Sequence, residues 1–426
     1  MKSYQEMTKE ELLQEKEGLE KEYKKIKELG LALDMSRGKP SAEQLDLSMG
    51  LLDAVDAKTV VASENGTDLR NYGIVDGIPE AKELIAQMVG CKAENVIVYG
   101  NSSLNIMYDQ IARAEIFGLC GNTPWSRLDK VKFLCPVPGY DRHFAITEDF
   151  GIEMINIPMH EDGPDMDLVE KYVADPAVKG IWCVPKYSNP QGVVYSDETV
   201  RRFAALKPAA ADFRIFWDNA YAVHHLYEED QAEILDILGE CEKARNPDMV
   251  FQFCSTSKVS FPGAGIAAIS ASTANIEDIK KRLTIQTIGH DKINQLRHVK
   301  YFKNMEGIQA HMMKQAAIIR PKFEMLEKML EEEIASRGIG SWISPKGGYF
   351  CRFEAMDGCA KAIVDKCKEA GVVLTGAGSP FPYKKDPTDS VLRIAPTYPS
   401  MEELTEAARV FVTVVRLVSV EKLLAD

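Results

Sequence analysis

The sequence lacks any ordered arrangement of cysteine or histidine. Nine cysteines are scattered from Cys91 to Cys367, and no two of them form a C-x-x-C pair. An odd number at irregular spacing favours neither a disulfide framework nor a zinc site. The seven histidines show no H-E-x-x-H or related spacing, so we expect no metal. A reducing, cytoplasmic compartment fits this cysteine usage best.

Long apolar runs and basic blocks are also missing. The longest apolar runs fall far short of the ~20 residues that span a bilayer. The densely charged segment 1–37 has no apolar signal-peptide core. The net charge is −13, and no Lys/Arg-rich block stands out. The sequence therefore favours neither a membrane nor nucleic acid as a partner.

The composition that is present is typical of a protein with a large core. Of 426 residues, 45% are hydrophobic and 27% charged, which predicts two or three soluble domains. Residues 8–30 are predicted to form an amphipathic surface helix. Thr8 and Glu11 make a capping box at its start, and Gly30 ends it.

A regular alternation occupies residues 95–270. Seven short apolar runs are expected as strands, at 96–99, 131–135, 152–157, 180–184, 213–217, 249–254 and 265–270. Helix-like segments lie between most of them, at 104–119, 166–173, 196–206 and 229–238. This pattern predicts an α/β domain with a mostly parallel seven-stranded sheet covered on both faces. No G-x-G-x-x-G follows the first strand, so a dinucleotide-binding fold is not favoured.

The pattern changes after Asp291. A long helix is expected at 305–333, with Pro321 as a kink or boundary. The strands and helices expected after it are at 347–353, 360–370, 372–374, 390–395 and 401–418. We predict a large domain at 46–299 and a smaller α+β domain at 300–426. The N-terminal helix and loop, 1–45, are assigned to the smaller domain.

Ligands of α/β sheets bind at the carboxyl ends of the strands, so the residues that follow each strand carry the functional argument. Lys258 follows the run 249–254. It is either an ordinary exposed lysine or one that forms a Schiff base with a carbonyl cofactor. Asp218 follows the run 213–217, and an aspartate there needs a partner to stay ionised. A pyridinium N–H would be such a partner.

Other strand ends carry weaker signals. Gly100-Asn101-Ser102-Ser103 opens a helix and is either an anion site or a simple cap. Tyr140 either stacks on a planar ring or is an ordinary loop aromatic. Asn189 lies in an Asn-Pro-x-Gly sequence, which by itself indicates only a turn.

The order and spacing of these residues resemble the fold-type-I pyridoxal-phosphate enzymes, in particular the class I aminotransferase superfamily. The resemblance runs from about Leu33 to Leu417. The segments 36–40, 100–104 and 290–298 look like a divergent bacterial branch of aspartate aminotransferases. The resemblance implies pyridoxal 5′-phosphate as cofactor, amino acids and 2-oxo acids as substrates, and a homodimer.

The resemblance also implies roles for single residues. Lys258 would form the internal aldimine and then move the proton between the substrate Cα and the cofactor. Asp218 would keep the pyridinium nitrogen protonated, supported from behind by His143. Tyr221 and Asn189 would hydrogen-bond the phenolate oxygen.

Further implied roles concern the rest of the cofactor and the substrate. Tyr140 would stack on the ring, and Tyr72 would reach the phosphate of the partner's cofactor. Arg393 would clamp the substrate α-carboxylate, for which a planar guanidinium is well suited. Gly38 would line the substrate, with Arg37 facing it. The serines expected to cup the phosphate are Ser102, Ser103, Ser255 and Ser257.

The sequence departs from the family at one position. Relatives carry an arginine several residues after the lysine that neutralises the phosphate, but here the turn reads Pro262-Gly263-Ala264-Gly265. A buried phosphate without a cation is costly, so we expect a substitute. Lys292 is favoured, and Arg297, Lys39 and Arg37 are alternatives. The same residues are the candidates for a distal substrate carboxylate.

The predicted function is transfer of an amino group from an L-amino acid, with aspartate favoured, to 2-oxoglutarate in ping-pong half-reactions. A broader or aromatic specificity is the nearest variant, and a lyase on the same fold is the alternative. A cofactor-fold regulator is disfavoured, because only about 35 residues precede the fold and they form one acidic helix rather than a DNA-binding domain.

Overall fold

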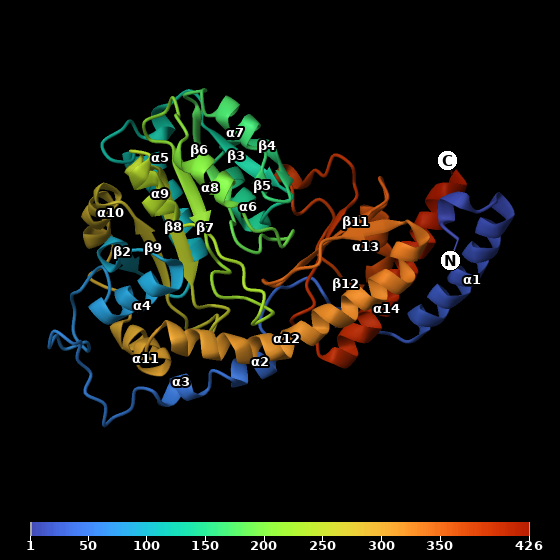
Figure 1. The fold of residues 1–426 in the computed structure, drawn as a ribbon, viewed down its shortest axis with the longest axis horizontal. Coiled ribbons are helices and arrows are strands. Elements are labelled where there is room, and N and C mark those ends of the chain that lie inside the picture. The colour runs from blue at the N-terminus through green and yellow to red at the C-terminus, as the bar shows by residue number, and fades with distance from the viewer. Residues whose placement is uncertain (1, 426) are drawn as a thin grey trace.

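A large mixed sheet forms the centre of one lobe of the molecule (Figure 1). The computed structural model describes residues 2–425. The strand order is β2-β9-β8-β7-β6-β3-β4-β5. The strands are β2 (Val96–Val98), β3 (Lys132–Val137), β4 (Glu153–His160), β5 (Gly163–Pro164), β6 (Val178–Cys183), β7 (Arg214–Asp218), β8 (Val250–Ser255) and β9 (Ala267–Ala271).

The seven predicted strands are confirmed, together with the mostly parallel sheet. Strands β8, β7, β6, β3 and β4 are parallel neighbours. Strand β9 is antiparallel to both β2 and β8. The structure adds one strand to the prediction, because the two residues of β5 pair antiparallel with β4. The carboxyl ends of the parallel strands therefore share one edge of the sheet.

Helices cover both faces of the sheet. One hydrophobic cluster joins Phe133 and Phe251 to α5 and α10. Another joins Ile181 and Ile215 to α7, α8 and α9. The helices that precede α12 are α1 (Lys9–Glu28), α2 (Ala42–Asp46), α3 (Gly50–Asp53), α4 (Pro79–Val89), α5 (Ser103–Phe117), α6 (Asp141–Asp149), α7 (Met166–Tyr172), α8 (Asp197–Ala204), α9 (Ile237–Lys243), α10 (Thr273–Gln286) and α11 (Lys292–Phe302). Within residues 2–425, no helix is both long and apolar enough to cross a membrane.

Two helix predictions need correction. The helix expected at 229–238 begins only at Ile237, because Asp236 caps it by accepting the N–H of Leu238. The preceding loop is held differently, with the Ala232 N–H donating to the Tyr187 hydroxyl. The long helix α12 (Met305–Glu333) continues through Pro321, so a boundary there is wrong. In Figure 1 it runs through the lower half of the picture from one lobe to the other.

The second lobe contains both ends of the chain. Its antiparallel sheet has the order β10-β11-β13, and the short strands β1 and β12 pair in parallel. One hydrophobic cluster includes Leu19 of α1, Leu326 of α12 and Phe411 of α14. The domain boundaries stay a prediction. The elements not yet given are β1 (Leu33–Asp34), β10 (Gly340–Trp342), β11 (Cys351–Ala355), α13 (Ala360–Glu369), β12 (Val372–Val373), β13 (Val391–Ile394) and α14 (Met401–Ala425).

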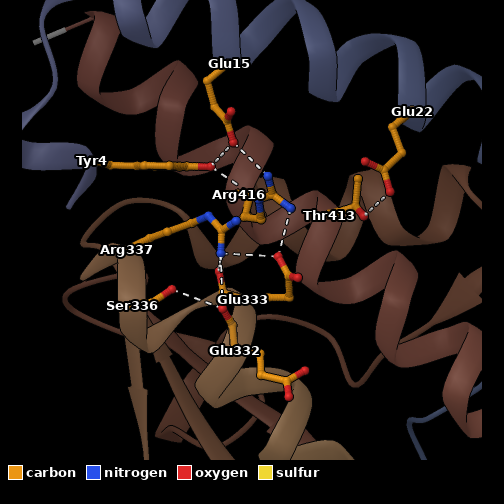
Figure 2. A network of polar contacts seen from close by, with 9 residues as sticks. All are labelled: Tyr4, Glu15, Glu22, Glu332, Glu333, Ser336, Arg337, Thr413 and Arg416. Carbon is orange, nitrogen blue, oxygen red and sulfur yellow. Dashed lines mark hydrogen bonds and ion pairs between the residues drawn. The ribbon is translucent and has the colours of Figure 1, made fainter. Parts of the chain in front are cut away.

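A polar network fixes the first residues to the last helix (Figure 2). Arg416 of α14 donates to Glu15 of α1 at 2.7 Å and to Glu333 at 2.9 Å. The buried Tyr4 hydroxyl donates to Glu15 and accepts from Arg416. Arg337 adds a second guanidinium, 3.2 Å from the Glu333 carboxylate. The two ends of the chain are thus tied together by charge as well as by packing.

Candidate active site

A cavity of about 530 Å³ lies at the carboxyl ends of the parallel strands. Its wall comes from both lobes: the segments after β2, β3, β6, β7 and β8, and residues of the second lobe. Most residues predicted from the sequence lie on this wall. They are Arg37, Gly38, Ser102, Ser103, Tyr140, Asn189, Asp218, Tyr221, Ser255, Ser257, Lys258 and Arg393.

Lys258 is half-buried on this wall, in the turn that follows β8. Its Nζ lies 5.1 Å from the centre of the Tyr221 ring and 5.9 Å from that of Tyr349. Within residues 2–425 it forms no ion pair. Burial lowers the pKa of Lys258, and the charge of Asp218 only partly opposes this shift. A depressed lysine pKa makes a free amine available as base or nucleophile.

Buried polar side chains hold the turn that carries Lys258. The carbonyl of Val259 accepts from His311 Nε2 at 2.9 Å, Gln315 Nε2 at 3.3 Å and Ser48 Oγ at 3.4 Å. The last of these precedes α3, whereas the other two belong to α12. On the far side of the turn, His298 of α11 lies 2.8 Å from the Ser260 hydroxyl. Three separate segments therefore fix the backbone around the lysine.

Asp218 ends β7 and is buried. Its Oδ2 lies 3.0 Å from Nε2 of His143, the first turn of α6 having brought that histidine behind the carboxylate. The His143 ring in turn stacks on Trp182, with ring centres 4.5 Å apart. The other oxygen, Oδ1, is buried and has no hydrogen-bond partner within residues 2–425. An unpaired buried carboxylate oxygen beside a cavity calls for a donor from a ligand.

Small hydroxyl residues gather at another part of the cavity. Ser102 caps α5 by accepting the N–H of Asn105, so the simple-cap interpretation is correct as far as it goes. The hydroxyls of Ser255 and Ser257 lie 2.8 Å apart. The free N–H groups at the start of α5, together with these hydroxyls, suit an anion.

Arg393 brings the second lobe to the cavity. Its Nη1 donates to Asp141 Oδ1 at 2.7 Å and to Asn189 Oδ1 at 3.4 Å. Its guanidinium carbon lies 4.9 Å from the centre of the Phe350 ring. A Cβ on Gly38 would collide with that ring, which explains the glycine. Segments far apart in the sequence thus meet around Arg393.

Four predicted residues lie elsewhere in the single chain. Tyr72 and Lys292 line a separate pocket of about 480 Å³, with Tyr72 81% exposed. Lys39 places its ammonium 3.8 Å from the centre of the Tyr398 ring. Arg297 donates to its neighbour Asn294 at 3.4 Å. Of the four cations considered for the missing arginine, Arg37 alone lines the cavity.

The sequence analysis missed two charged residues of the wall, Asp141 and Arg142. Both lie in the first turn of α6, which directly follows Tyr140. Arg142 is exposed and forms no ion pair or hydrogen bond in the described residues 2–425. The available signal was the strand-end rule itself, because these residues follow β3 as Tyr140 does.

The chain matches known proteins along almost its whole length. A family model described as aspartate amino-transferase matches residues 7–426. An aspartate aminotransferase of Corynebacterium glutamicum is 45% identical over 406 residues, covering 95% of this chain and 94% of that protein. The crystal structure of an aspartate transaminase from the same species has a TM-score of 0.96 at 43% identity, covering 99% of both chains.

A more distant structure shows the fold alone. It is an α-aminoadipate aminotransferase of Thermus thermophilus complexed with N-(5′-phosphopyridoxyl)-L-leucine, with a TM-score of 0.73 at 17% identity and coverage of 92% of this chain and 93% of that one. The present chain is an enzyme of the pyridoxal-phosphate-dependent transaminase class. Within that class it belongs to the aspartate aminotransferase family.

The family implies pyridoxal phosphate, and the cavity fits that cofactor. The unpaired Oδ1 of Asp218 suits a ring N–H. The start of α5 and the serine hydroxyls suit the phosphate. Lys258 is an amine on the same wall, with a pKa lowered by burial.

Proposed function

We propose that the enzyme transfers the amino group of L-aspartate to 2-oxoglutarate in two half-reactions at this cavity. The family and the name of the 45% identical Corynebacterium glutamicum protein support aspartate as donor. The observation that carries the proposal is the buried, unpaired Asp218 Oδ1 on the same wall as Lys258. In this proposal Asp218 binds the electron-withdrawing ring and Lys258 is the base, and both line one cavity.

The residues of the chain would share the work as follows. Bound pyridoxal phosphate supplies the carbonyl group and the electron sink. Lys258 would hold the cofactor and, as a free amine, would move the proton between the substrate Cα and the cofactor. Asp218 would accept the ring N–H, while His143 would fix the orientation of its carboxylate. Tyr221 and Asn189 donate to the ring oxygen.

Two positions would bind the two carboxylates of aspartate. Arg393 takes the α-carboxylate, because its fork can bind both oxygens. Arg37 and Arg142 are the remaining arginines of the cavity wall, and both are exposed without a carboxylate partner in residues 2–425. We assign the distal carboxylate to these two.

We also propose a homodimer that completes each site. Tyr72 is highly exposed and shares its surface pocket with Lys292. If Tyr72 reaches the phosphate in the partner's cavity, Lys292, which lines the same pocket as Tyr72, also lies near that phosphate and supplies the missing cation. A cytoplasmic location stays a prediction from the sequence.

The central test replaces Lys258. The purified wild-type protein should be yellow and should form oxaloacetate and glutamate from aspartate and 2-oxoglutarate. Lys258→Ala should lose turnover by at least about 10⁴-fold, because the base and the cofactor bond go together. Full turnover in this variant would contradict the assignment. Ammonia and pyruvate from cysteine conjugates would instead support the lyase.

The distal assignment is tested separately. Arg142→Gln and Arg37→Gln should each raise the KM for aspartate by roughly tenfold while leaving the KM for alanine within about twofold, since alanine has no distal carboxylate. Arg393→Gln should weaken both amino acids alike. If the Arg142 and Arg37 variants raised the KM for aspartate and for alanine equally, these arginines would attract substrates by their charge and would not recognise the distal carboxylate.

A further inference from the structure

Asp141 forms an ion pair with Arg393, the residue that is proposed to bind the substrate α-carboxylate. Its Oδ1 lies 2.7 Å from Nη1 of Arg393, and this is the ion pair that Arg393 makes within residues 2–425. The two residues are 252 positions apart in the sequence and come from different lobes. Both line the cavity. A negative charge at a carboxylate-binding arginine must be reconciled with the arrival of a second carboxylate.

The donors of Arg393 are unevenly used. Nη1 is engaged by Asp141 and, more weakly, by Asn189 at 3.4 Å. Nε donates to Thr375 Oγ1 at 3.4 Å. Nη2 has no partner in the part of the chain that the structure describes. A carboxylate that binds both terminal nitrogens finds one of them free and the other held by Asp141.

The contact made by Asp141 is one that can be released. It uses one oxygen and one nitrogen, and the Asp141 side chain is 32% exposed, whereas that of Arg393 is 9% exposed. Two carboxylates on one guanidinium repel each other. Asp141 lies in the first turn of α6, where the helix N-terminus stabilises a carboxylate that has left the arginine. The displaced charge thus keeps a favourable environment.

We propose that Asp141 is a resident counter-ion of Arg393 that is exchanged for the substrate α-carboxylate. This rests on the proposed function, in which Arg393 is the α-carboxylate clamp. Asp141 keeps the guanidinium charge neutralised in the empty site and sets how tightly every carboxylate binds. It sets the affinity for carboxylates and does not touch the reacting atoms.

The test measures binding of carboxylates that cannot react. Titration calorimetry of the holoenzyme with propionate and with succinate gives dissociation constants without turnover. Asp141→Asn should tighten both roughly tenfold, because a neutral amide competes less well than a charge-assisted bond. Asp141→Ser removes the same charge and should also tighten the binding of both carboxylates. It serves as the second variant in case Asp141→Asn does not fold. The KM for aspartate should fall with the dissociation constants.

The matched control is Asp149→Asn, at the other end of the same helix. Asp149 is exposed, bonds Tyr108 at 3.3 Å and does not contact Arg393. This variant changes the net charge equally and should leave both dissociation constants within about twofold. Unchanged or weaker binding in both Asp141 variants overturns the exchange.

A second background separates this inference from the proposed function. Arg393→Gln should abolish propionate binding, and adding Asp141→Asn to it should restore nothing. If Arg393→Gln binds propionate as the wild type does, the clamp assignment fails. If Arg393→Gln loses propionate binding, but the Asp141 variants with Arg393 intact do not bind propionate more tightly than the wild type, the clamp assignment stands and the exchange fails.

Discussion

Lys186 is a second lysine whose surroundings lower its pKa. It is buried, and its Nζ donates to the carbonyl of Ala222 at 2.7 Å. Burial lowers the pKa of Lys186 to about 8. Unlike Lys258, it does not line the cavity and has no role in the proposed chemistry. It therefore offers a measurement of the cost of burying a lysine here.

The pKa of Lys186 is lower in the folded state than in the unfolded state. Below pH 8 the lysine is charged in both states, and the whole cost of burying its charge destabilises the folded protein. This cost, about 3 kcal/mol, disappears as the pH rises from about 8 to 10.5. Lys186→Met should therefore raise the free energy of unfolding at pH 7 by about 2 kcal/mol, after losing one hydrogen bond. Urea denaturation between pH 7 and 10.5 should show this gain vanish.

The control for this prediction is Lys243→Met, which removes a largely exposed lysine paired with Glu240. Its effect should stay nearly constant over the same pH range. A gain from Lys186→Met that did not depend on pH would show that packing, rather than charge, is responsible.

At the level of single residues, the sequence predicts what stands at strand ends. Asp218 and Lys258 follow buried strands, and a parallel sheet necessarily brings such positions to one edge. The Asp141–Arg393 pair had no comparable signal. Its partners come from different lobes, and no local pattern indicates which arginine will meet which aspartate.

The elements at the two ends of the chain depend on each other. Arg416 of α14 bridges Glu15 of α1 and Glu333 of α12 (Figure 2). Arg416→Met should lower the free energy of unfolding by about 2 kcal/mol, because two carboxylates lose a partly buried partner. Urea denaturation measures this change.

Arg409→Met is the matched control on the same helix. Arg409 is exposed and pairs with Glu406 one turn away, so its loss should cost no more than about 0.5 kcal/mol. Equal effects of the two variants would mean that the network contributes nothing beyond an ordinary surface pair.

The sequence predicts elements well where the pattern is local. The helix at 8–30 appears as Lys9–Glu28, with the expected Thr8–Glu11 capping box. The segment 229–236 looked helical by composition, but a contact with Tyr187 holds its backbone in a loop. Such tertiary contacts override propensity and are invisible in a single sequence.

For the whole molecule, the proposed homodimer leads to a direct prediction. Ile285 and Ile288 are 80% and 60% exposed, close in sequence to the pocket of Tyr72 and Lys292. Ile285→Asp should shift the protein toward monomers by roughly a hundredfold in dissociation constant, because the interface would bury an unpaired charge. Sedimentation velocity measures the shift.

Leu29→Asp provides the control at an exposed apolar residue of the other lobe, just after α1. It should leave the association state unchanged. If Ile285→Asp remains dimeric, this face is not the interface. If the monomer forms and still holds its cofactor as tightly as the dimer, Tyr72 and Lys292 do not complete the partner's site.

The contact between α1 and α14 has a consequence for synthesis. α1 is synthesised long before α14, the helix against which it packs, so α1 lacks this contact while most of the sequence between them is translated. At roughly 5–20 residues per second, that wait is on the order of half a minute. The strands of the large sheet all emerge earlier, and they can pair while α1 is still unpaired. We therefore expect the lobe that carries Arg393 to complete its packing after the strands of the large sheet have emerged, so that Arg393 joins the cavity wall late.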